Sequence, residues 1–357
     1  MNNFFILLIT TFLSACVNNE KYEIYNALQA IDIDKLMINY HAENLFNGSI
    51  LVAEKGKVIY QNALGSADFD SGRELDLDTS FYIASVSKPF TAMAVMMLKE
   101  DGLLSYDDKL SKYFSVFPKY ADRVTIAQLL RHTSGIPDYF TLEPYDDIKN
   151  SDVLAILASQ EKLDFEPGDK FSYSNSGYAL LSLIIEQVSG QKFHKFLTKR
   201  IFEPLKMTRT LVFDESKPQI DNRAVGYNRT EIKNDYRILT TGDGGIYSTV
   251  GDLHKWDRAL YTEQLISKTT MDEAFFEKPL NDGTKAGFWD GSGYGFGWMI
   301  NKNIVKHSGG LFGYRAYIER QMEREYTIII LTNKGDALDL NDITSKVSKI
   351  LSNYTIL

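Results

Sequence analysis

Strand-like and helix-like segments follow one another along this chain in an order that restricts its fold. Residues 48–65 contain two β-rich runs joined at Lys55-Gly56, which is typical of a hairpin. Three further strand-like runs lie near the other end, at residues 294–300, 316–322 and 326–333, and most of the residues between carry helical patterns. We therefore predict an α+β fold in which both ends of the chain build one sheet and a mainly helical domain is inserted between them.

Helical patterns flank these strands. Residues 21–45 form an amphipathic pattern, and a second amphipathic helix is expected from about Asp339 to the end of the chain. We divide the catalytic unit, residues 22–357, into a sheet-containing domain (22–80 and 290–357) and a mainly helical domain (81–289).

The first residues have the features of an export signal. An apolar run from Phe4 to Leu13 is too short to span a bilayer but suits the core of a signal peptide, residues 1–15. The run ends in LSAC, which resembles a bacterial lipobox, and Cys16 is the only cysteine of the chain. We expect a lipid on Cys16, a tether at residues 16–21, and attachment to a bacterial membrane facing the periplasm or cell exterior. A plain secretory signal with a chance cysteine is the alternative.

The composition and net charge of the chain indicate which classes of ligand it can bind. Hydrophobic residues make up 44% of the chain and charged residues 24%, as in ordinary globular proteins. The formal net charge of −8 argues against nucleic-acid binding, which requires a basic face. We expect a small-molecule or peptide substrate.

A serine and a lysine are placed for nucleophilic chemistry in FYIASVSKPF, residues 81–90. A helix that begins at Ser85 brings Lys88 onto the same face, about 4.5 Å further along the axis, within reach of the hydroxyl. The helix start also favours developing negative charge. The alternative is that Ser85 only caps the helix. The same spacing recurs in two pairs that do not begin a helix, Ser159/Lys162 and Ser189/Lys192.

The stretch FSYSNSGY places Tyr173 and Asn175 in a loop before a helix that starts near Gly177. Beside an ammonium, the phenolate of Tyr173 would become accessible enough to accept a proton. The side-chain amide of Asn175 can hold a substrate amide. The pattern is weak alone, since residues 60–62 match it inside a strand.

A third segment, KHSGGLFGY, carries His307 and Gly309 at the entry to a C-terminal strand. Its glycines allow a substrate backbone to approach closely. A lone histidine is more often a surface or core residue than a functional one.

In the order SxxK, YxN and HxG, these segments resemble the three motifs of the serine β-lactamase and penicillin-binding-protein superfamily. The similar branch includes class C β-lactamases, D-Ala-D-Ala carboxypeptidases and related esterases. Two further strings resemble it, LLRHTSGIPDY (129–139) and GDGGIYSTVGDLHKW (242–256), and the resemblance extends from about Asn47 to Asn333. It implies a β-lactamase/transpeptidase-like fold, an antiparallel sheet flanked by helices.

The resemblance also implies roles for individual residues. Ser85 would attack a carbonyl and become acylated, and Lys88 and Tyr173 would move the proton. Asn175 would orient the substrate, which His307 and Gly309 would also contact. The backbone N–H groups of Ser85 and Gly310 would form the oxyanion hole. In the second string, His132 is expected to pack a loop.

No metal or cofactor is expected. The remaining histidines, His41, His194 and His254, are not spaced as metal ligands. No glycine-rich phosphate-binding loop follows a predicted strand.

Three functions fit these motifs: an esterase or D-Ala-D-Ala carboxypeptidase-like hydrolase, a class C-type β-lactamase, and a non-catalytic penicillin-binding or sensor lipoprotein. The β-lactamases of this branch normally carry lysine where this chain has His307. Histidine is mostly neutral at pH 7, so selectivity for anionic substrates should be weak unless Lys306 or Arg315 reaches the pocket. We favour an enzyme, because Ser85, Lys88 and Tyr173 are all present. Because His307 offers a hydrogen bond more than a charge, we expect this enzyme to turn over small neutral esters more efficiently than β-lactams.

Overall fold

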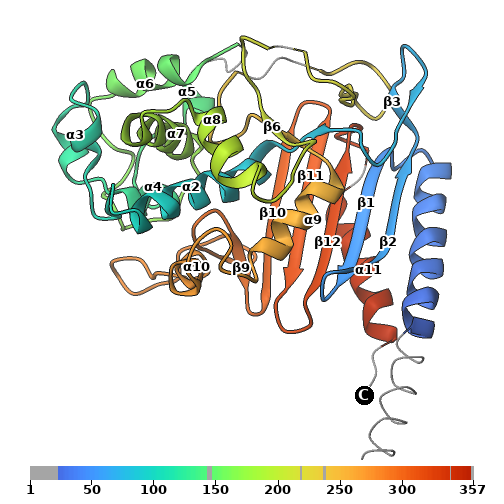
Figure 1. The fold of residues 1–357 in the computed structure, drawn as a ribbon. Helices are drawn as coiled ribbons and strands as arrows, with labels where there is room; N and C mark the ends of the chain where they lie inside the picture. The colour runs from blue at the N-terminus through green and yellow to red at the C-terminus, as the bar shows by residue number, and fades with distance from the viewer. Residues whose placement is uncertain (1–22, 143–146, 218, 236–238, 338, 355–357) are drawn as a thin grey trace, which may run out of the picture.

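A seven-stranded antiparallel sheet forms the centre of the computed structural model, which describes residues 23–142, 147–217, 219–235, 239–337 and 339–354. The strands follow the order β2-β1-β12-β11-β10-β9-β8. Their bounds are β1 (Gly48–Glu54), β2 (Lys57–Leu64), β8 (Gly293–Tyr294), β9 (Met299–Asn301), β10 (Ile304–Leu311), β11 (Tyr314–Gln321) and β12 (Tyr326–Thr332). Because β1 pairs directly with β12, strands from opposite ends of the chain lie side by side (Figure 1). The predicted α+β fold is confirmed.

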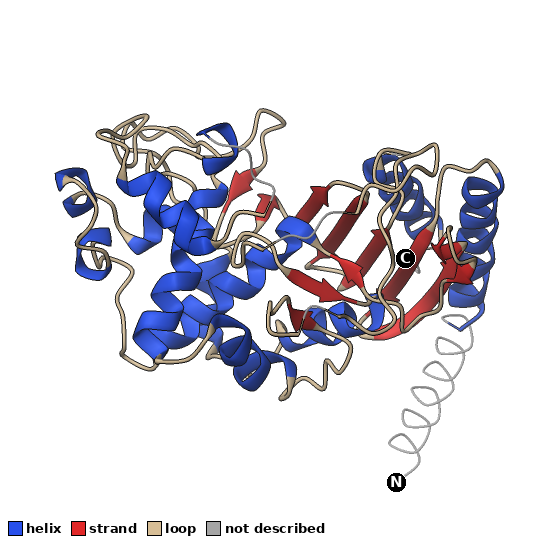
Figure 2. Ribbon diagram, turned by 90° about the horizontal axis from the view of Figure 1, so that it is seen from above, coloured by secondary structure: helices blue, strands red, loops and turns tan. Residues whose placement is uncertain are grey.

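Helices cover both faces of this sheet (Figure 2). Successive side chains of a strand point to opposite faces, so on β12 Ile328 and Ile330 join one apolar cluster while Ile329 joins the other. The first cluster lies under the N-terminal helix, residues 23–42, and under α11 (Leu340–Asn353). The central strands β1 and β12 are therefore covered on both faces, and every residue of these two strands is buried.

The opposite face of the sheet meets the inserted helical part of the chain (Figure 1). There, α9 (Val250–Ala259) packs on β1 and β12, although it falls within the range that we assigned to the helical domain. The other helices are η1 (Ala84–Ser87), α2 (Lys88–Glu100), α3 (Leu110–Tyr113), η2 (Lys119–Asp122), α4 (Ile126–Leu130), α5 (Tyr139–Leu142), α6 (Asn150–Ala158), α7 (Asn175–Ser189), α8 (Phe193–Leu197), η3 (Thr198–Phe202) and α10 (Lys268–Ala274). The described residues also form five short strands outside the main sheet: β3 (Ser66–Asp68), β4 (Arg73–Glu74), β5 (Phe81–Tyr82), β6 (Leu211–Val212) and β7 (Ile246–Ser248).

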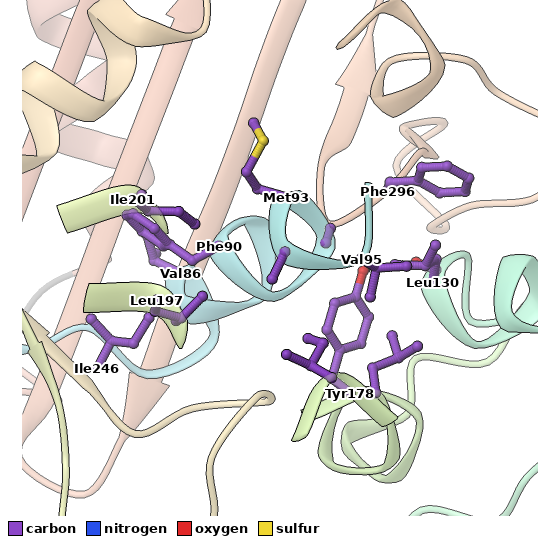
Figure 3. Close-up of a cluster of buried hydrophobic side chains, with 14 of the residues drawn as sticks. Val86, Phe90, Met93, Val95, Leu130, Tyr178, Leu197, Ile201, Ile246 and Phe296 are labelled. Carbon is purple, nitrogen blue, oxygen red and sulfur yellow. The ribbon is translucent and has the colours of Figure 1, made fainter. Parts of the chain in front are cut away.

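Helix α2 runs through the larger apolar core, and eleven of its residues are buried. Its Phe90 stacks on Trp256 of α9 at 4.2 Å between ring centroids. Figure 3 shows Phe90, Met93 and Val95 of α2 among apolar side chains from other elements. This packing holds the start of α2 in a fixed position, which matters because Lys88 is its first residue.

Several predicted elements are confirmed. The β1–β2 hairpin turns at Lys55 and Gly56, whose φ angles of 49° and 80° are the two positive values that a type I′ turn requires. The C-terminal helix has Asp339 as its N-cap. Cys16, the signal peptide and the tether lie outside the described residues. Within the described part of the chain, no helix has the length and apolar content needed to cross a bilayer.

Candidate active site

Residues from all three motifs meet where the start of α2, the start of α7 and strand β10 come together. Lys88 Nζ lies 3.0 Å from Ser85 Oγ and 2.8 Å from Asn175 Oδ1. It also lies 4.9 Å from the ring centroid of Tyr173. From β10, Gly309 packs so closely on η1 that an added Cβ would lie 2.9 Å from Ser85 N. The structure therefore brings the predicted residues into one site.

Ser85 lies in the 3₁₀ turn η1, and the α-helix begins three residues later, at Lys88. This corrects the prediction of a helix that starts at the serine. The preceding residue, Ala84, has a φ of 46°, a left-handed conformation that costs a non-glycine residue about 1 kcal/mol or more. Neither η1 nor α2 has a side-chain N-cap, so capping does not account for Ser85.

Lys88 is fully buried and donates to three acceptors. Besides Ser85 Oγ and Asn175 Oδ1, these include the backbone carbonyl oxygen of Asp243, at 2.9 Å. Burial lowers the pKa of Lys88 to about 8, although the negative charges of Asp243 and Asp138 act in the opposite direction. A substantial fraction of Lys88 is therefore neutral near pH 8, which a general base requires.

The three acceptors around Lys88 differ in one respect. Asn175 Oδ1 and the carbonyl oxygen of Asp243 can only accept, whereas the Ser85 hydroxyl can also donate. When Lys88 loses a proton, two N–H bonds satisfy these two oxygens and the lone pair is left to face Ser85. This arrangement allows Lys88 to take the hydroxyl proton.

Asn175 is the first residue of α7, two positions earlier than the predicted helix start. Its Nδ2 donates to Asp138 Oδ2 at 3.1 Å, and its backbone N–H donates to Asp138 Oδ1 at 3.2 Å. Since a carboxylate can only accept, these bonds orient the amide so that Oδ1 faces Lys88.

The sequence motifs did not predict that two acidic residues, Asp138 and Asp243, belong to the site. Both lie in the strings that extended the family resemblance, GIPDY and GDGG. Those strings were the available signal, but they gave no indication that the acids surround Lys88.

The hydroxyl of Tyr173 is buried and has no hydrogen-bond partner of good geometry among the described residues. Burial raises the pKa of Tyr173 well above its usual range, and the charges of Asp243 and Asp138 add to this, while the Ser85 side chain acts in the opposite direction. The expectation of an accessible phenolate was therefore wrong. In this environment Tyr173 keeps its proton and can serve as a donor.

His307 is fully buried within β10, not at the strand's entry as predicted. Its Nδ1 lies 2.7 Å from the carbonyl oxygen of Ser308, so Nδ1 carries the proton. Nε2 then accepts from the hydroxyl of Tyr294, at 3.0 Å. Burial and, to a lesser extent, the charge of Lys88 together lower the pKa of His307 to about 3. His307 is therefore a neutral group with both ring nitrogens occupied.

Lys306 and Arg315, the two cations that could have supplied a charge in place of His307, lie on the opposite face of the sheet from His307. Side chains alternate along a strand, so Lys306 and Gly310 point away from the face that carries His307 and Gly309. Arg315 pairs directly with Gly310 across the β10–β11 ladder and shares its face. Its guanidinium donates to the carbonyl oxygens of the β10–β11 hairpin, Phe312 and Tyr314.

His132 lies at the back of the site. It is buried, and its ring centroid is 4.3 Å from that of Tyr173 and 4.6 Å from that of Tyr294. Its Nδ1 accepts from the backbone N–H of Ser174, at 3.1 Å. These contacts fit the expected packing role. Among the described residues, no cluster of three or more histidine or acidic side chains could hold a metal ion.

Comparison with known proteins identifies relatives over most of the chain. A family model described as Beta-lactamase matches residues 33–346, which include every residue of the site. A penicillin-binding protein of Bacillus subtilis (strain 168) is 35% identical over 331 residues, covering 85% of this chain and 72% of that protein. The protein flp of Staphylococcus aureus (strain COL) is 30% identical, but the match spans 59% of its length and 80% of this chain. A solved structure, the octameric penicillin-binding protein homologue from Pyrococcus abyssi, superposes with a TM-score of 0.79 at 28% identity, covering 90% of this chain and 77% of that one.

Proposed function

Because this chain belongs to the beta-lactamase family, we propose that it is a serine hydrolase that acts through an acyl-enzyme on Ser85. The observation that carries the proposal is the contact of 3.0 Å between Ser85 Oγ and a fully buried Lys88 whose pKa is lowered to about 8. Neutral Lys88 takes the hydroxyl proton as Ser85 Oγ attacks the substrate carbonyl. The oxygen–carbon bond forms, and the carbonyl electrons move onto the oxygen.

The developing oxyanion is held by the backbone N–H groups of Ser85 and Gly310. Support comes from Gly309, whose close packing on η1 brings this part of β10 next to the nucleophile. Each such donor is worth about 3–4 kcal/mol in the transition state.

As the tetrahedral intermediate collapses, the bond between its carbon and the leaving group breaks. The leaving group takes a proton from Tyr173, and Lys88 passes the proton that it took from Ser85 to Tyr173. The raised pKa of Tyr173 supports a donor role, and its ring lies 4.9 Å from Lys88 Nζ. Water then attacks the acyl carbonyl, the bond between its carbon and Ser85 Oγ breaks, and the acid is released. Tyr173 and Lys88 move the proton in the reverse direction, from water to Ser85 Oγ.

We propose small neutral esters as the preferred substrates. Class C β-lactamases present a lysine to the substrate carboxylate, but His307 offers no charge here because its pKa is lowered to about 3. The cations Lys306 and Arg315 lie on the opposite face of the sheet from His307. A carboxylate-bearing β-lactam therefore gains little from this part of the site.

A second candidate is a D-Ala-D-Ala carboxypeptidase-like enzyme that penicillin acylates. One observation favours it: the relative from Bacillus subtilis is named a penicillin-binding protein. The carboxypeptidases of this branch also carry histidine in the third motif, so His307 suits both candidates.

The experiment compares kcat/KM for p-nitrophenyl butyrate with kcat/KM for a chromogenic cephalosporin on one preparation at pH 7. We expect the ester to be preferred in the wild type and the preference to narrow in His307→Lys. A tenfold preference of the wild type for the cephalosporin, about 1.4 kcal/mol of transition-state binding, would instead assign a β-lactamase. Faster release of D-alanine from a D-Ala-D-Ala peptide than of butyrate from the ester would select the carboxypeptidase.

We also propose that the chain is exported and attached to a bacterial membrane through a lipid on Cys16. The LSAC string supports this proposal. Cys16→Ser should move the mature protein into the soluble fraction or stop its maturation. Unchanged membrane partitioning of a correctly cleaved Cys16→Ser protein would exclude the lipid anchor.

A further inference from the structure

Two acidic residues that take no part in the proposed bond-making and proton-transfer steps, Asp138 and Asp243, lie around Lys88. Asp138 accepts three hydrogen bonds, from the backbone N–H of Phe140 at 3.4 Å and from the backbone and side chain of Asn175 at 3.2 and 3.1 Å. Two of the three bonds go to the residue that presents Oδ1 to Lys88. Asp138 therefore fixes the orientation of an acceptor of the lysine.

Asp243 approaches Lys88 from the loop that precedes β7. Its backbone carbonyl oxygen accepts from Lys88 Nζ at 2.9 Å, and its buried Oδ2 accepts from the hydroxyl of Tyr139 at 2.7 Å. Tyr139 follows Asp138 in sequence, and its backbone N–H donates to Ser176 Oγ at 2.8 Å. The two acids are thus connected through Tyr139 and the first turn of α7.

We propose that Asp138 and Asp243 are positioning residues that act on the Ser85 nucleophile through Lys88 and Asn175. The proposal rests on the proposed function, since it concerns how the same serine is activated. Asp138 holds the amide of Asn175 in the orientation that accepts from Lys88, and both carboxylates place negative charge beside a lysine removed from water.

The two acids also influence when Lys88 is protonated. Burial lowers the pKa of Lys88, and the charges of Asp243 and Asp138 limit that decrease. The titratable groups around this lysine are Asp138, Asp243, Tyr173, Tyr178, His132 and His307. Burial raises the pKa of both tyrosines and lowers the pKa of both histidines, so these four groups carry no charge near neutral pH. Burial also raises the pKa of Asp138 and Asp243, and the charge of Lys88 opposes that rise, so the two carboxylates and the lysine ammonium stabilise one another's charged forms.

The test measures the rate at which a fluorophosphonate labels Ser85 between pH 5 and 10. In the wild type the rate should rise with the deprotonation of Lys88. Asp243→Asn removes a charge but keeps the backbone carbonyl that contacts Lys88, so its rise should move to lower pH by about one unit. Asp138→Asn should shift the rise in the same direction. It should also lower the plateau of the labelling rate about tenfold or more, because the side chain of Asn175 loses the carboxylate that orients it.

Matched variants separate these effects from changes in fold or net charge. Asp122→Asn removes an exposed carboxylate from η2 and should leave the profile unchanged. Tyr139→Phe removes a hydrogen bond to Asp243 without altering the acid, and should shift the rise in labelling rate by less in the same direction. This variant provides the test if Asp243→Asn does not fold. Thermal melts establish which variants are folded.

If a folded variant is labelled at Ser85 and the midpoint of its labelling rate coincides with that of the wild type or lies at higher pH, this proposal is overturned. The proposed function would be unaffected by that result. Absence of labelling at Ser85 in the wild type would overturn the proposed function as well. The two failures are therefore distinguishable.

Discussion

Lys88 Nζ lies 3.0 Å from Ser85 Oγ, and the lysine that makes this contact is fully buried in the core around α2. Removal from water favours the neutral amine, which is the form that can accept the hydroxyl proton. The same burial fixes the side chain, so the base is held close to the nucleophile before any substrate arrives.

The first prediction concerns the pH dependence of the proposed hydrolysis. Because the pKa of Lys88 is lowered to about 8, kcat/KM for a neutral ester should rise with pH and reach half its plateau near pH 8. Lys88→Arg, which stays protonated over this range, should lose several orders of magnitude in kcat. A wild-type profile that is flat from pH 6 to 9, or that falls with pH, would contradict the assignment of Lys88 as the base.

The second prediction concerns Tyr173. If Tyr173 and Lys88 serve one proton relay, Tyr173→Phe and Lys88→Ala should each lose several orders of magnitude in kcat, and the double variant should lose little more than either. Since Tyr173 keeps its proton, Tyr173→Phe should leave the midpoint of the acid limb near pH 8. Losses that multiply in the double variant would argue against a shared relay.

The third prediction tests the close packing of β10 on η1. In Gly309→Ala the new Cβ would lie 2.9 Å from Ser85 N and 3.1 Å from Val86 N, and it would also meet the carbonyl oxygen of Ile83. The strand must move away from Ser85, so ester hydrolysis should fall at least 100-fold.

Gly251→Ala is the matched control for this variant. Gly251 lies in α9, where the nearest atom to an added Cβ is 3.9 Å away and alanine favours the helix. We expect wild-type kcat/KM in this control. Full activity in Gly309→Ala would mean that β10 does not have to approach Ser85 so closely.

The fourth prediction concerns stability in acid. His307 titrates at about pH 3 in the folded protein against 6.5 for an ordinary histidine, and the pKa of His132 is also well below 6.5. Below pH 6.5 the unfolded chain binds protons that the folded protein does not, so the free energy of unfolding falls as pH falls from 6.5 toward 3. Each histidine contributes up to about 1.4 kcal/mol per pH unit.

Urea unfolding between pH 7 and 5 measures this loss in a range above the titration of most carboxylates. His307→Gln should reduce the dependence by about one proton, while a variant of the half-buried His194, His194→Gln, should keep most of it. An unchanged dependence in His307→Gln would show that His307 is not a buried neutral group.

The sequence predicted the architecture because its main signals are local. The β1–β2 turn is indicated by Gly56, a residue type that adopts positive φ readily, and the amphipathic pattern of α11 sets its position after Asp339. The grouping of Ser85, Lys88, Tyr173 and Asn175 came instead from the order of the motifs, since each spacing alone recurs elsewhere in the chain.

The electrostatics of the site could not be predicted in this way. The pKa of Tyr173 depends on burial and on carboxylates that lie more than thirty positions away in sequence, at Asp138 and Asp243. The lowered pKa of His307 depends on burial and on the charge of Lys88, and its Nε2 contacts the hydroxyl of Tyr294 from β8. Such contacts are set by tertiary packing, which no short motif encodes.

The most direct test of the central claim is intact-mass analysis with peptide mapping after exposure to a fluorophosphonate and, separately, to penicillin. We predict that the wild type gains one fluorophosphonate adduct, mapped to Ser85, and that Ser85→Ala gains none while keeping its thermal melting temperature. Labelling of the alanine variant to the same extent as the wild type, or an adduct mapped to another residue, would contradict an acyl-enzyme on Ser85.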